Sequence, residues 1–366
     1  MKWVKLEGAG DVPLARSSHT ITAVGDTIYL FGGEHAPRVP IGSDVHAYNL
    51  QERVWRKLQV AGTPPPLRNA HAAAAIGTDL YVFGGRCGID IGEAALNDLY
   101  KLDTTTATWA AVEPAGEVRP PRRSYAAAAS AGGKLYIFGG CGEGCTGRLN
   151  DLWEFDPAAN RWRQLPSSDA IKILSAACCL GPLSATIPRH LFPPPASHAQ
   201  GRGGPGFVAV LGALFVVAGF AGHETNDVHR FDLATETWDC PRCCSAEAAA
   251  APSGCGHASP VVLPPRSVCA VATHGCSTCP HANHIIASCG EVDPSNEGHA
   301  GAGMYSNDSF CMDPACGHWH KLEAGGEVPA PRGWLAATAC SAGLVVHGGN
   351  SLTNERLGDM YLLEMH

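Results

Sequence analysis

A short apolar run that ends in two glycines recurs along this chain and constrains its fold more than any other feature. The three clearest copies have diglycines that begin at Gly32, Gly84 and Gly139, so the unit repeats every 52 to 55 residues. Each copy continues into a second apolar run and then reaches a tryptophan. These tryptophans are Trp55, Trp109 and Trp162. A repeat of this length predicts small supersecondary units that bury their apolar faces against their neighbours.

Three later copies are less regular, but each still has its apolar run. The runs are Leu214–Gly222, Ile285–Gly290 and Leu344–Gly349. The fourth and fifth copies reach Trp238 and Trp319, whereas the sixth reaches the last residue, His366, without a tryptophan. A diglycine after an apolar run, followed by a tryptophan, is typical of the kelch repeats of β-propellers. We therefore predict an all-β protein built as one six-bladed kelch propeller.

The tryptophan that the sixth copy lacks is found at the other end of the chain. Trp3 lies 52 residues before Trp55, which is one repeat length. We therefore expect Lys2–Leu6 to form the outer strand of the last blade, so that the N-terminal strand closes the ring. Such closure leaves no unpaired sheet edge between the first and last blades.

The repeat also sets approximate limits for the blades within a single domain, residues 1–366. The blades are expected at about residues 14–58, 66–113, 120–166, 200–241, 264–323 and 330–366, the last completed by residues 1–7. Three stretches do not fit the period and have the composition of loop insertions: residues 163–201, 239–263 and 275–283.

Charge and hydropathy exclude several classes of partner. The net charge of −8 argues against a nucleic-acid or anionic-membrane surface. The longest apolar stretch, Phe207–Gly222, is too short to span a bilayer and reads as two buried strands. No basic-then-apolar signal segment opens the sequence. We expect a cytoplasmic protein, with the nucleus as the alternative location.

The 16 cysteines do not recur at matching positions in the blades, so they predict free thiols rather than a disulfide framework. Two close pairs, Cys240/Cys243 and Cys276/Cys279, suggest a four-cysteine zinc site. Strand alternation argues against it, because the pairs fall in insertions on opposite faces, about 20 Å apart across a strand of about six residues. A local site at Cys276/Cys279 is the weaker alternative.

We letter the strands of each blade a to d from the channel outward. Because neighbouring strands alternate in direction, the loop between strands b and c lies on the face where strand a begins. An arginine starts strand a in every blade: Arg16, Arg68, Arg122, Arg202, Arg266 and Arg332, with Arg123 doubling the third. A ring of guanidinium groups in an acidic protein could attract a small anion. The alternative is that these arginines bind loop carbonyls and carboxylates between blades.

The b–c loop of the fifth blade, Gly290–Asp308, is the longest of these loops and is acidic. It carries Glu291, Asp293, Glu297 and His299. Carboxylates with an imidazole suit a divalent ion such as Fe(II), Mn(II) or Zn(II). Their spacing matches no standard metal motif, so a solvated acidic loop is the alternative interpretation.

Several stretches carry motifs that kelch repeats in general do not share. The most specific are GEVDPSNEGHAGAG (Gly290–Gly303), PRGW (Pro331–Trp334) and HGG…TNERLGDMY (His347–Tyr361). Others are RSSH (Arg16–His19), FGGE…RVPIGSDV (Phe31–Val45), FGGR (Phe83–Arg86), RGGPGF (Arg202–Phe207) and PRSV (Pro265–Val268). Together they resemble the plant specifier proteins of glucosinolate breakdown: the nitrile-specifier, epithiospecifier and thiocyanate-forming proteins. The resemblance covers all six blades and excludes the three insertions.

The resemblance implies an Fe(II) site and a substrate site on one mouth of the channel. In specifier proteins, Glu, Asp and His spaced by four residues hold Fe(II); here Glu291 and His299 match the first and third ligands. Ser295 stands at the second position, where the family has Asp, so Asp293 and Glu297 are the weaker alternatives. The family's arginine and tryptophan beside the substrate match Arg86 and Trp334.

The activity implied by the resemblance is the diversion of a thiohydroximate O-sulfate, the aglycone of a glucosinolate, toward a nitrile. The small sulfated anion would bind arginine, whose planar fork matches sulfate oxygens. The rival hypothesis is a non-catalytic scaffold that binds a protein partner on its loop-rich face. Arg86, Trp334, Glu291 and His299 favour chemistry, whereas Ser295 and the lack of an attached catalytic or adaptor domain favour a scaffold.

Overall fold

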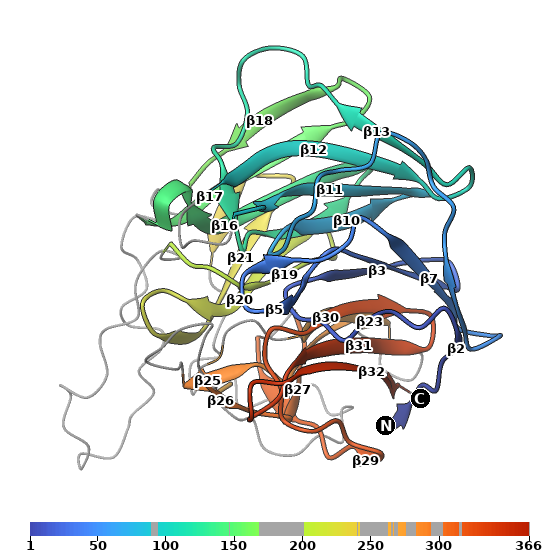
Figure 1. The fold of residues 1–366 in the computed structure, drawn as a ribbon. Helices are drawn as coiled ribbons and strands as arrows, with labels where there is room; N and C mark the ends of the chain where they lie inside the picture. The colour runs from blue at the N-terminus through green and yellow to red at the C-terminus, as the bar shows by residue number, and fades with distance from the viewer. Residues whose placement is uncertain are drawn as a thin grey trace, which may run out of the picture.

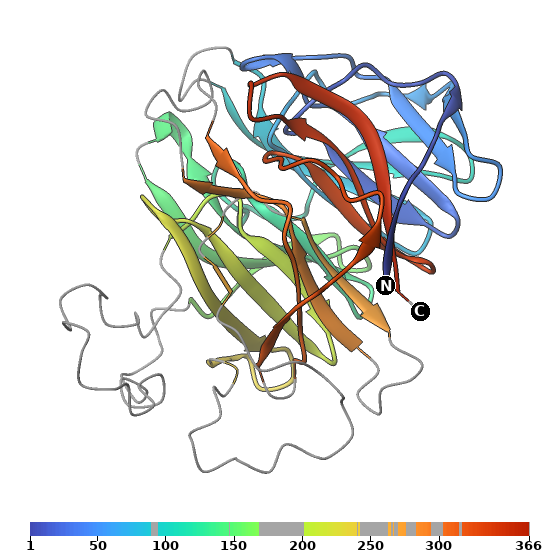
Figure 2. The same ribbon diagram turned by 90° about the horizontal axis from the view of Figure 1, so that it is seen from below.

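The computed structural model describes residues 1–88, 94–145, 147–167, 201–239, 241, 263–264, 266, 270–275, 283–293, 303–314 and 317–365. The strands of these residues form six antiparallel sheets arranged around one axis (Figures 1 and 2). This confirms the all-β six-bladed propeller. Most of the three predicted insertions, and both cysteine pairs, lie outside the described residues.

Each blade is a meander of four strands, from the axis outward. The first is β3 (Thr20–Val24), β4 (Thr27–Phe31), β7 (Val45–Asn49) and β8 (Val54–Lys57). The second is β10 (Ala72–Ile76), β11 (Asp79–Arg86), β12 (Ala95–Asp103) and β13 (Thr108–Val112). The third is β15 (Ala127–Ala131), β16 (Lys134–Gly142), β17 (Arg148–Asp156) and β18 (Arg161–Leu165), with β14 (Arg123–Ser124) also paired to β16.

The remaining three blades repeat this plan. The fourth is β19 (Gly206–Val210), β20 (Ala213–Phe220), β21 (Glu224–Asp232) and β22 (Thr237–Asp239). The fifth is β23 (Ala270–Gly275), β24 (Asn283–Ser288), β27 (Ser309–Met312) and β28 (Trp319–Lys321). The sixth is β30 (Ala336–Cys340), β31 (Gly343–Asn350), β32 (Arg356–Glu364) and β1 (Lys2–Lys5). Short additions are β2 (Ala9–Gly10), β9 (Ala61–Gly62), β29 (Gly325–Gly326) and two hairpins, β5–β6 (Glu34–Ala36, Val39–Pro40) and β25–β26 (Glu291–Asp293, Met304–Tyr305).

The N-terminal strand closes the ring as predicted. Strand β1 runs antiparallel to β32, with Trp3 opposite Leu363, and the two chain ends lie side by side (Figures 1 and 2). Trp3 is only 1% exposed and packs with Leu344 and Val346 of the same blade and Ile286 of the fifth. The N-terminal strand therefore contributes both backbone hydrogen bonds and a core side chain to the last blade.

The hydrophobic core is divided among the contacts between blades. Six clusters of buried side chains each draw on two neighbouring blades, including the contact of the last blade with the first. In that contact, Val345 and Met360 of the sixth blade pack with Ile21 and Trp55 of the first. Each blade thus buries both faces only when the ring is complete, which is the physical reason for predicting one domain from six repeats.

One buried arginine in each blade binds the end of that blade's second strand, and in five of the six contacts its backbone also binds the preceding blade. Arg68 donates from Nη1 to the Gly84 carbonyl of its own blade at 2.9 Å, and its backbone oxygen accepts a 3.0 Å hydrogen bond from Gly33 of the preceding blade. In five blades the arginine side chain donates to the carbonyl of the residue 16 positions later; these arginines are Arg16, Arg68, Arg123, Arg202 and Arg332. In the fifth blade, Arg266 donates to the carbonyl of Cys289, 23 positions later.

In four blades an aspartate also binds the guanidinium group of this arginine. Arg123 binds Asp151 through two hydrogen bonds of 2.7 and 2.8 Å. Burial alone would raise the pKa of Asp151, but the hydrogen bonds and charge of Arg123 outweigh it and hold the pKa below its usual value. The same bidentate pair joins Arg68 to Asp98, Arg202 to Asp227 and Arg332 to Asp359.

One sequence-based interpretation is corrected by these pairs. Asp98, Asp151 and Asp227, each preceded by an asparagine, neutralise arginines, whereas the equivalent Asp308 pairs with Lys321 at 2.8 Å. In the third blade, Arg123 rather than Arg122 is the ring member. Arg122 is exposed and donates to the Ala95 carbonyl at 3.3 Å.

Deletion of residues 1–7 should open the ring, because it removes β1 and exposes the edge of β32. We expect a loss of at least about 3–5 kcal/mol in the free energy of unfolding, the usual effect of removing one buried tryptophan. Thermal and urea unfolding would measure it, with Lys2→Ala at the exposed neighbouring position as the control. Equal melting temperatures for the truncated and full chains would contradict closure.

The neighbouring arginines of the third blade offer a matched pair of variants. Arg123→Leu leaves the Asp151 carboxylate and the Gly139 carbonyl without their buried partner, and should cost about 3–5 kcal/mol. Arg122→Leu removes an exposed side chain and should change stability by no more than about 0.5 kcal/mol. Urea unfolding of both proteins checks the assignment, and similar losses in the two would refute it.

Candidate functional site

A ring of backbone hydrogen bonds surrounds the channel two residues after the arginines. Ser18, Ala70, Tyr125, Gly204 and Trp334 all have positive φ, between 52° and 59°. Their amides join neighbouring blades: Ala70 donates to Ser18, Tyr125 to Ala70, Gly204 to Tyr125, and Ser18 to Trp334, at 2.8–3.0 Å. The equivalent fifth-blade residue, 268, lies outside the described part of the chain. Left-handed backbone at bulky residues is uncommon and clusters at functional sites.

Tyr125 and Trp334 are the two large side chains on this ring. They come from the third and sixth blades, which are opposite each other in a six-bladed ring. Their ring centroids are nevertheless 5.4 Å apart in an edge-to-face arrangement. The two aromatic side chains therefore meet near the axis and form an apolar floor at the mouth of the channel.

Arg86 joins this floor at the end of β11. Its guanidinium carbon lies 5.6 Å from the centre of the Tyr125 ring. Its Nε donates to Oδ1 of Asn69 at 3.0 Å, and Nη2 lies 3.9 Å from Oε2 of Glu34. Arg86 Nη2 is buried and forms no hydrogen bond among the described residues. A fixed guanidinium with one unsatisfied donor beside two aromatic rings can accept an anionic group.

Glu34 is the centre of the charge network that holds Arg86. It is fully buried, accepts a 2.7 Å hydrogen bond from Nδ2 of Asn69, and forms an ion pair with Arg356 of the sixth blade at 3.2 Å. Burial raises the pKa of Glu34, although the charges of Arg356 and Arg86 oppose that rise. Two guanidinium groups around one carboxylate leave a net positive charge at this side of the mouth.

Glu291 lies on the opposite side of the same mouth, at the start of β25. It is 6% exposed and lies next to Trp334. Burial, reinforced by the negative charge of Glu224, raises the pKa of Glu291 to about 7, while a hydrogen bond with Trp334 opposes the rise. Tyr125 and Trp334 thus connect Arg86 to Glu291 across the channel.

The structure brings together three of the predicted site residues: Arg86, Trp334 and Glu291. Asp293 ends β25 and is exposed, so it is not part of the buried cluster. Ser295, Glu297 and His299 lie outside the described residues. In the part of the chain that is described, no three His, Cys, Asp or Glu side chains are grouped closely enough to hold a metal ion.

Sequence reasoning missed Tyr125, Glu34, Asn69 and Arg356. A signal for Tyr125 was available, because it occupies the same position after the ring arginine as Trp334 does. Nothing in the spacing indicates the pairing of Glu34 with Arg356, since 322 residues separate them and only ring closure brings the first and sixth blades together.

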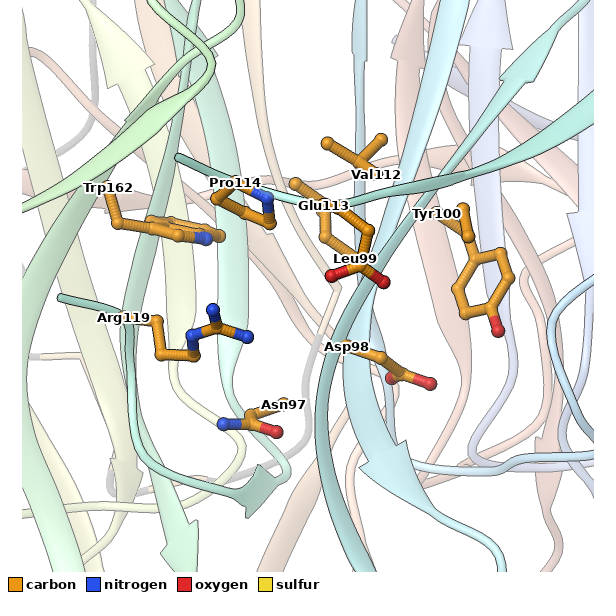
Figure 3. Close-up of a pocket in the computed structure, with 10 residues that line it drawn as sticks. Asn97, Asp98, Leu99, Tyr100, Val112, Glu113, Pro114, Arg119 and Trp162 are labelled. Atoms are coloured by element: carbon orange, nitrogen blue, oxygen red, sulfur yellow. The ribbon is translucent and has the colours of Figure 1, made fainter. Parts of the chain in front are cut away.

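A separate small cavity lies away from this cluster, between the second and third blades (Figure 3). Its volume is about 110 Å³, and Arg119 lies beneath Trp162 in it, near Asn97. The cavity borders Asp98, which already neutralises Arg68. It is therefore a feature of the contact between blades, and the mouth of the channel is the stronger candidate site.

Family models match most of the regular repeats. The KLHDC2/KLHL20/DRC7 Kelch-repeats domain matches residues 1–181, and the Kelch motif matches residues 201–244. Together with the diglycines and the six blades, these matches show the family. The chain is a kelch-repeat propeller. Among the described residues of this kelch chain, no helix is long and apolar enough to cross a bilayer.

Curated relatives of the kelch chain differ in how much of each chain the match covers. The N-(sulfonatooxy)prop-2-enimidothioate sulfolyase of Thlaspi arvense is 28% identical over 100% of this chain and 97% of its own length. Human Kelch domain-containing protein 3 is 31% identical, but over 45% of this chain and 44% of its length. The Leucine-zipper-like transcriptional regulator 1 homolog of Drosophila melanogaster is 24% identical, over 98% of this chain and 32% of its length.

Glu291→Gln should change the pH dependence of stability. The pKa of Glu291 is about 7 in the folded protein, against an ordinary value of 4.5. Because the folded value is the higher one, its contribution to the free energy of unfolding is fully present below about pH 4.5 and is lost as the pH rises through about 7. Between about pH 5 and pH 8, chelator-treated wild type should lose about 2–3 kcal/mol more than Glu291→Gln.

Urea unfolding at several pH values measures this difference. Glu323→Gln, at an exposed glutamate, is the control and should follow the wild type. Parallel pH profiles for wild type and Glu291→Gln would contradict the burial of this carboxyl group.

Proposed function

We propose that this kelch chain is a specifier-type protein that directs the decay of a thiohydroximate O-sulfate toward a nitrile. The observation that carries the proposal is the convergence of Arg86, Tyr125, Trp334 and Glu291 on one mouth of the channel. The full-length similarity to a sulfolyase supports the same substrate class. In this reaction the aglycone releases sulfate and its sulfur atom, and its carbon–nitrogen unit becomes the nitrile.

Arg86 would bind the sulfate group of the aglycone. Its unsatisfied Nη2 is a buried donor, and a hydrogen bond between charged partners is stronger than one between neutral partners. Asn69 and Glu34 hold the guanidinium in place before the substrate arrives, so little entropy is lost on binding. The bound sulfate would then be oriented for departure as the leaving group.

Tyr125 and Trp334 would exclude water from the reacting carbon and nitrogen. Their edge-to-face contact covers the channel beneath Arg86, and both side chains are partly buried there. Exclusion of water strengthens the interaction of Arg86 with the sulfate, because the effective dielectric falls. The walls also limit the substrate's orientation.

Fe(II) is the cofactor proposed for this activity. Glu291 fits it, because it is a buried carboxylate whose neighbouring charges, Glu224 and Asp293, are also negative, and such a site favours a cation. Glu291 and His299 would hold the ion, with Ser295, Asp293 or Glu297 as a weaker third donor. When bound, Fe(II) would supply an electrophilic centre for the sulfur of the aglycone.

The alternative function is a protein-interaction scaffold without chemistry. Two observations favour it: partial similarity to Kelch domain-containing protein 3 and exposed apolar side chains on the loops before the ring arginines. These side chains are Val12, Leu14, Leu67, Val118 and Val328. A protein partner would bury them on the same face as the mouth.

An anaerobic nitrile assay distinguishes the two functions. Wild type, Ser295→Asp and His299→Ala are mixed with Fe(II), a thioglucosidase and a glucosinolate, and the nitrile and isothiocyanate products are separated by gas chromatography. We expect Ser295→Asp to raise both Fe(II) affinity and nitrile yield, because it adds an anionic oxygen donor, and His299→Ala to lower both.

Ser43→Asp adds the same charge to the corresponding loop of the first blade and is the matched control. It should leave iron affinity and the product ratio as in the wild type. If Ser295→Asp neither raises iron affinity nor yields nitrile above the thioglucosidase-only level, the specifier function is refuted and the scaffold is favoured.

A further inference from the structure

The residue before the diglycine differs between the last blade and the first three. It is Phe31, Phe83 and Phe138 in the first three blades, but His347 in the sixth. His347 lies on β31 and is fully buried, at 0% exposure. A titratable group therefore occupies a hydrophobic position at the contact where the sixth blade meets the first, which we call the closing contact.

The aromatic packing at the closing contact matches that of the next contact around the ring. At that next contact, the Phe31 ring lies 5.4 Å from His71 of the second blade, edge to face. At the closing contact, the His347 ring lies 4.9 Å from His19 of the first blade, also edge to face, and 5.7 Å from Trp55. The closing contact thus keeps the packing but contains two histidines instead of one.

The two histidines share one hydrogen bond across the closing contact. Nε2 of His19 lies 2.9 Å from Nδ1 of His347, so one ring donates and the other accepts, which a neutral ring can do. The outer nitrogens, Nδ1 of His19 and Nε2 of His347, are buried and have no hydrogen-bond partner among the described residues. A proton added to this pair would therefore create a further buried, charged N–H group without an acceptor in that part of the chain.

The charged groups around the pair also oppose its protonation. The groups that act on it are Arg16, His46 and His71 of the first two blades and Arg332 and Asp359 of the sixth. Asp359 is the acidic member of this set, and Arg332 already binds it through two hydrogen bonds. Burial, the largest effect, lowers the pKa of His347 to about 3 and holds the pKa of His19 well below its usual value of 6.5.

The closing contact also holds part of the mouth of the channel in place. The amide of Ser18 donates to the carbonyl of Trp334 at 3.0 Å across it. The ion pair between Arg356 and Glu34, at 3.2 Å, crosses the same contact. Separation of the sixth blade from the first would therefore displace Trp334 and deprive Glu34 of one of its two arginines.

We propose that His19 and His347 form a pH-sensitive switch: when they take up protons below about pH 6, the sixth blade separates from the first and the mouth opens. The closed state loses stability as the pH falls, because histidines in the open state bind protons with an ordinary pKa of about 6.5. Glu34 acts in the opposite direction, since burial raises its pKa and acid then favours the closed state. The switch concerns closure of the ring and does not depend on the proposed function.

Hydrogen–deuterium exchange of the full chain, followed by mass spectrometry, tests the switch at the closing contact. Labelling times at pH 6 and pH 5 are adjusted so that the intrinsic exchange is equal. The reporter peptides contain Ser18 and Gly349, whose amides bond across the closing contact, and the comparison peptides contain Tyr125 and Gly140, whose amides bond across the contacts of the third blade. Between these pH values, protection of the reporters should fall by more than about tenfold, since each histidine contributes close to tenfold, and that of the comparison peptides by less than about twofold.

Variants of the pair make the outcome specific. His347→Phe introduces the residue of the first three blades, and it should make the fall in protection at least about fivefold smaller, because one titrating group is lost. His19→Ala introduces the residue that the third blade has three positions after its ring arginine, Ala126, and it decides the question should His347→Phe fail to fold. His223→Asn, at an exposed histidine, is the matched control and should respond as the wild type does.

A fall in protection that is confined to the closing contact, and is smaller in a folded variant of the pair, supports the switch. An equal fall at the closing contact and at the contacts of the third blade overturns it. A folded His347→Phe or His19→Ala protein with the wild-type response to pH overturns it as well.

Discussion

The rest of the structure depends on the hydrogen bonds made by the arginine at the start of each blade. Its guanidinium donates to a carbonyl at the end of the second strand of its own blade. In five of the contacts its backbone oxygen accepts the amide of the equivalent glycine in the preceding blade. A Cβ atom at Gly32 or Gly348 would lie 2.6 Å from the carbonyl of the next arginine, so the close approach requires glycine. One residue thus couples strand pairing within a blade to packing between blades.

This coupling leaves the residue two positions later free to vary. The positions that follow the arginines have the same left-handed backbone, whether they hold serine, alanine, glycine, tyrosine or tryptophan. Their backbones join the blades, while their side chains face the axis. Large aromatic side chains at two of these positions form the floor of the mouth without changing the repeated backbone conformation. The blades therefore share one backbone plan, while the site at the mouth is asymmetric.

Electrostatic balance gives the two sides of the mouth different chemistry. Glu34 is neutralised by arginines from two other blades, and this side retains a donor for an anion. At Glu291, burial and the negative charges of Glu224 and Asp293 instead raise the pKa of the carboxyl group. In the function we propose, the first side would bind the sulfate group of the substrate and the second side would hold the cation that meets its sulfur atom.

The sequence by itself determined the six blades, the closing strand and the face that carries Arg86, Trp334 and Glu291, because the repeat period and strand alternation are local properties of the chain. Only the tertiary structure decided that Arg123, rather than Arg122, joins the ring, and that aspartates neutralise four ring arginines. It also decided that Tyr125 meets Trp334 and that Arg356 reaches Glu34. The contact of Arg356 with Glu34 joins residues 322 positions apart. The repeat predicts that the ring closes, but it does not specify which side chains then meet.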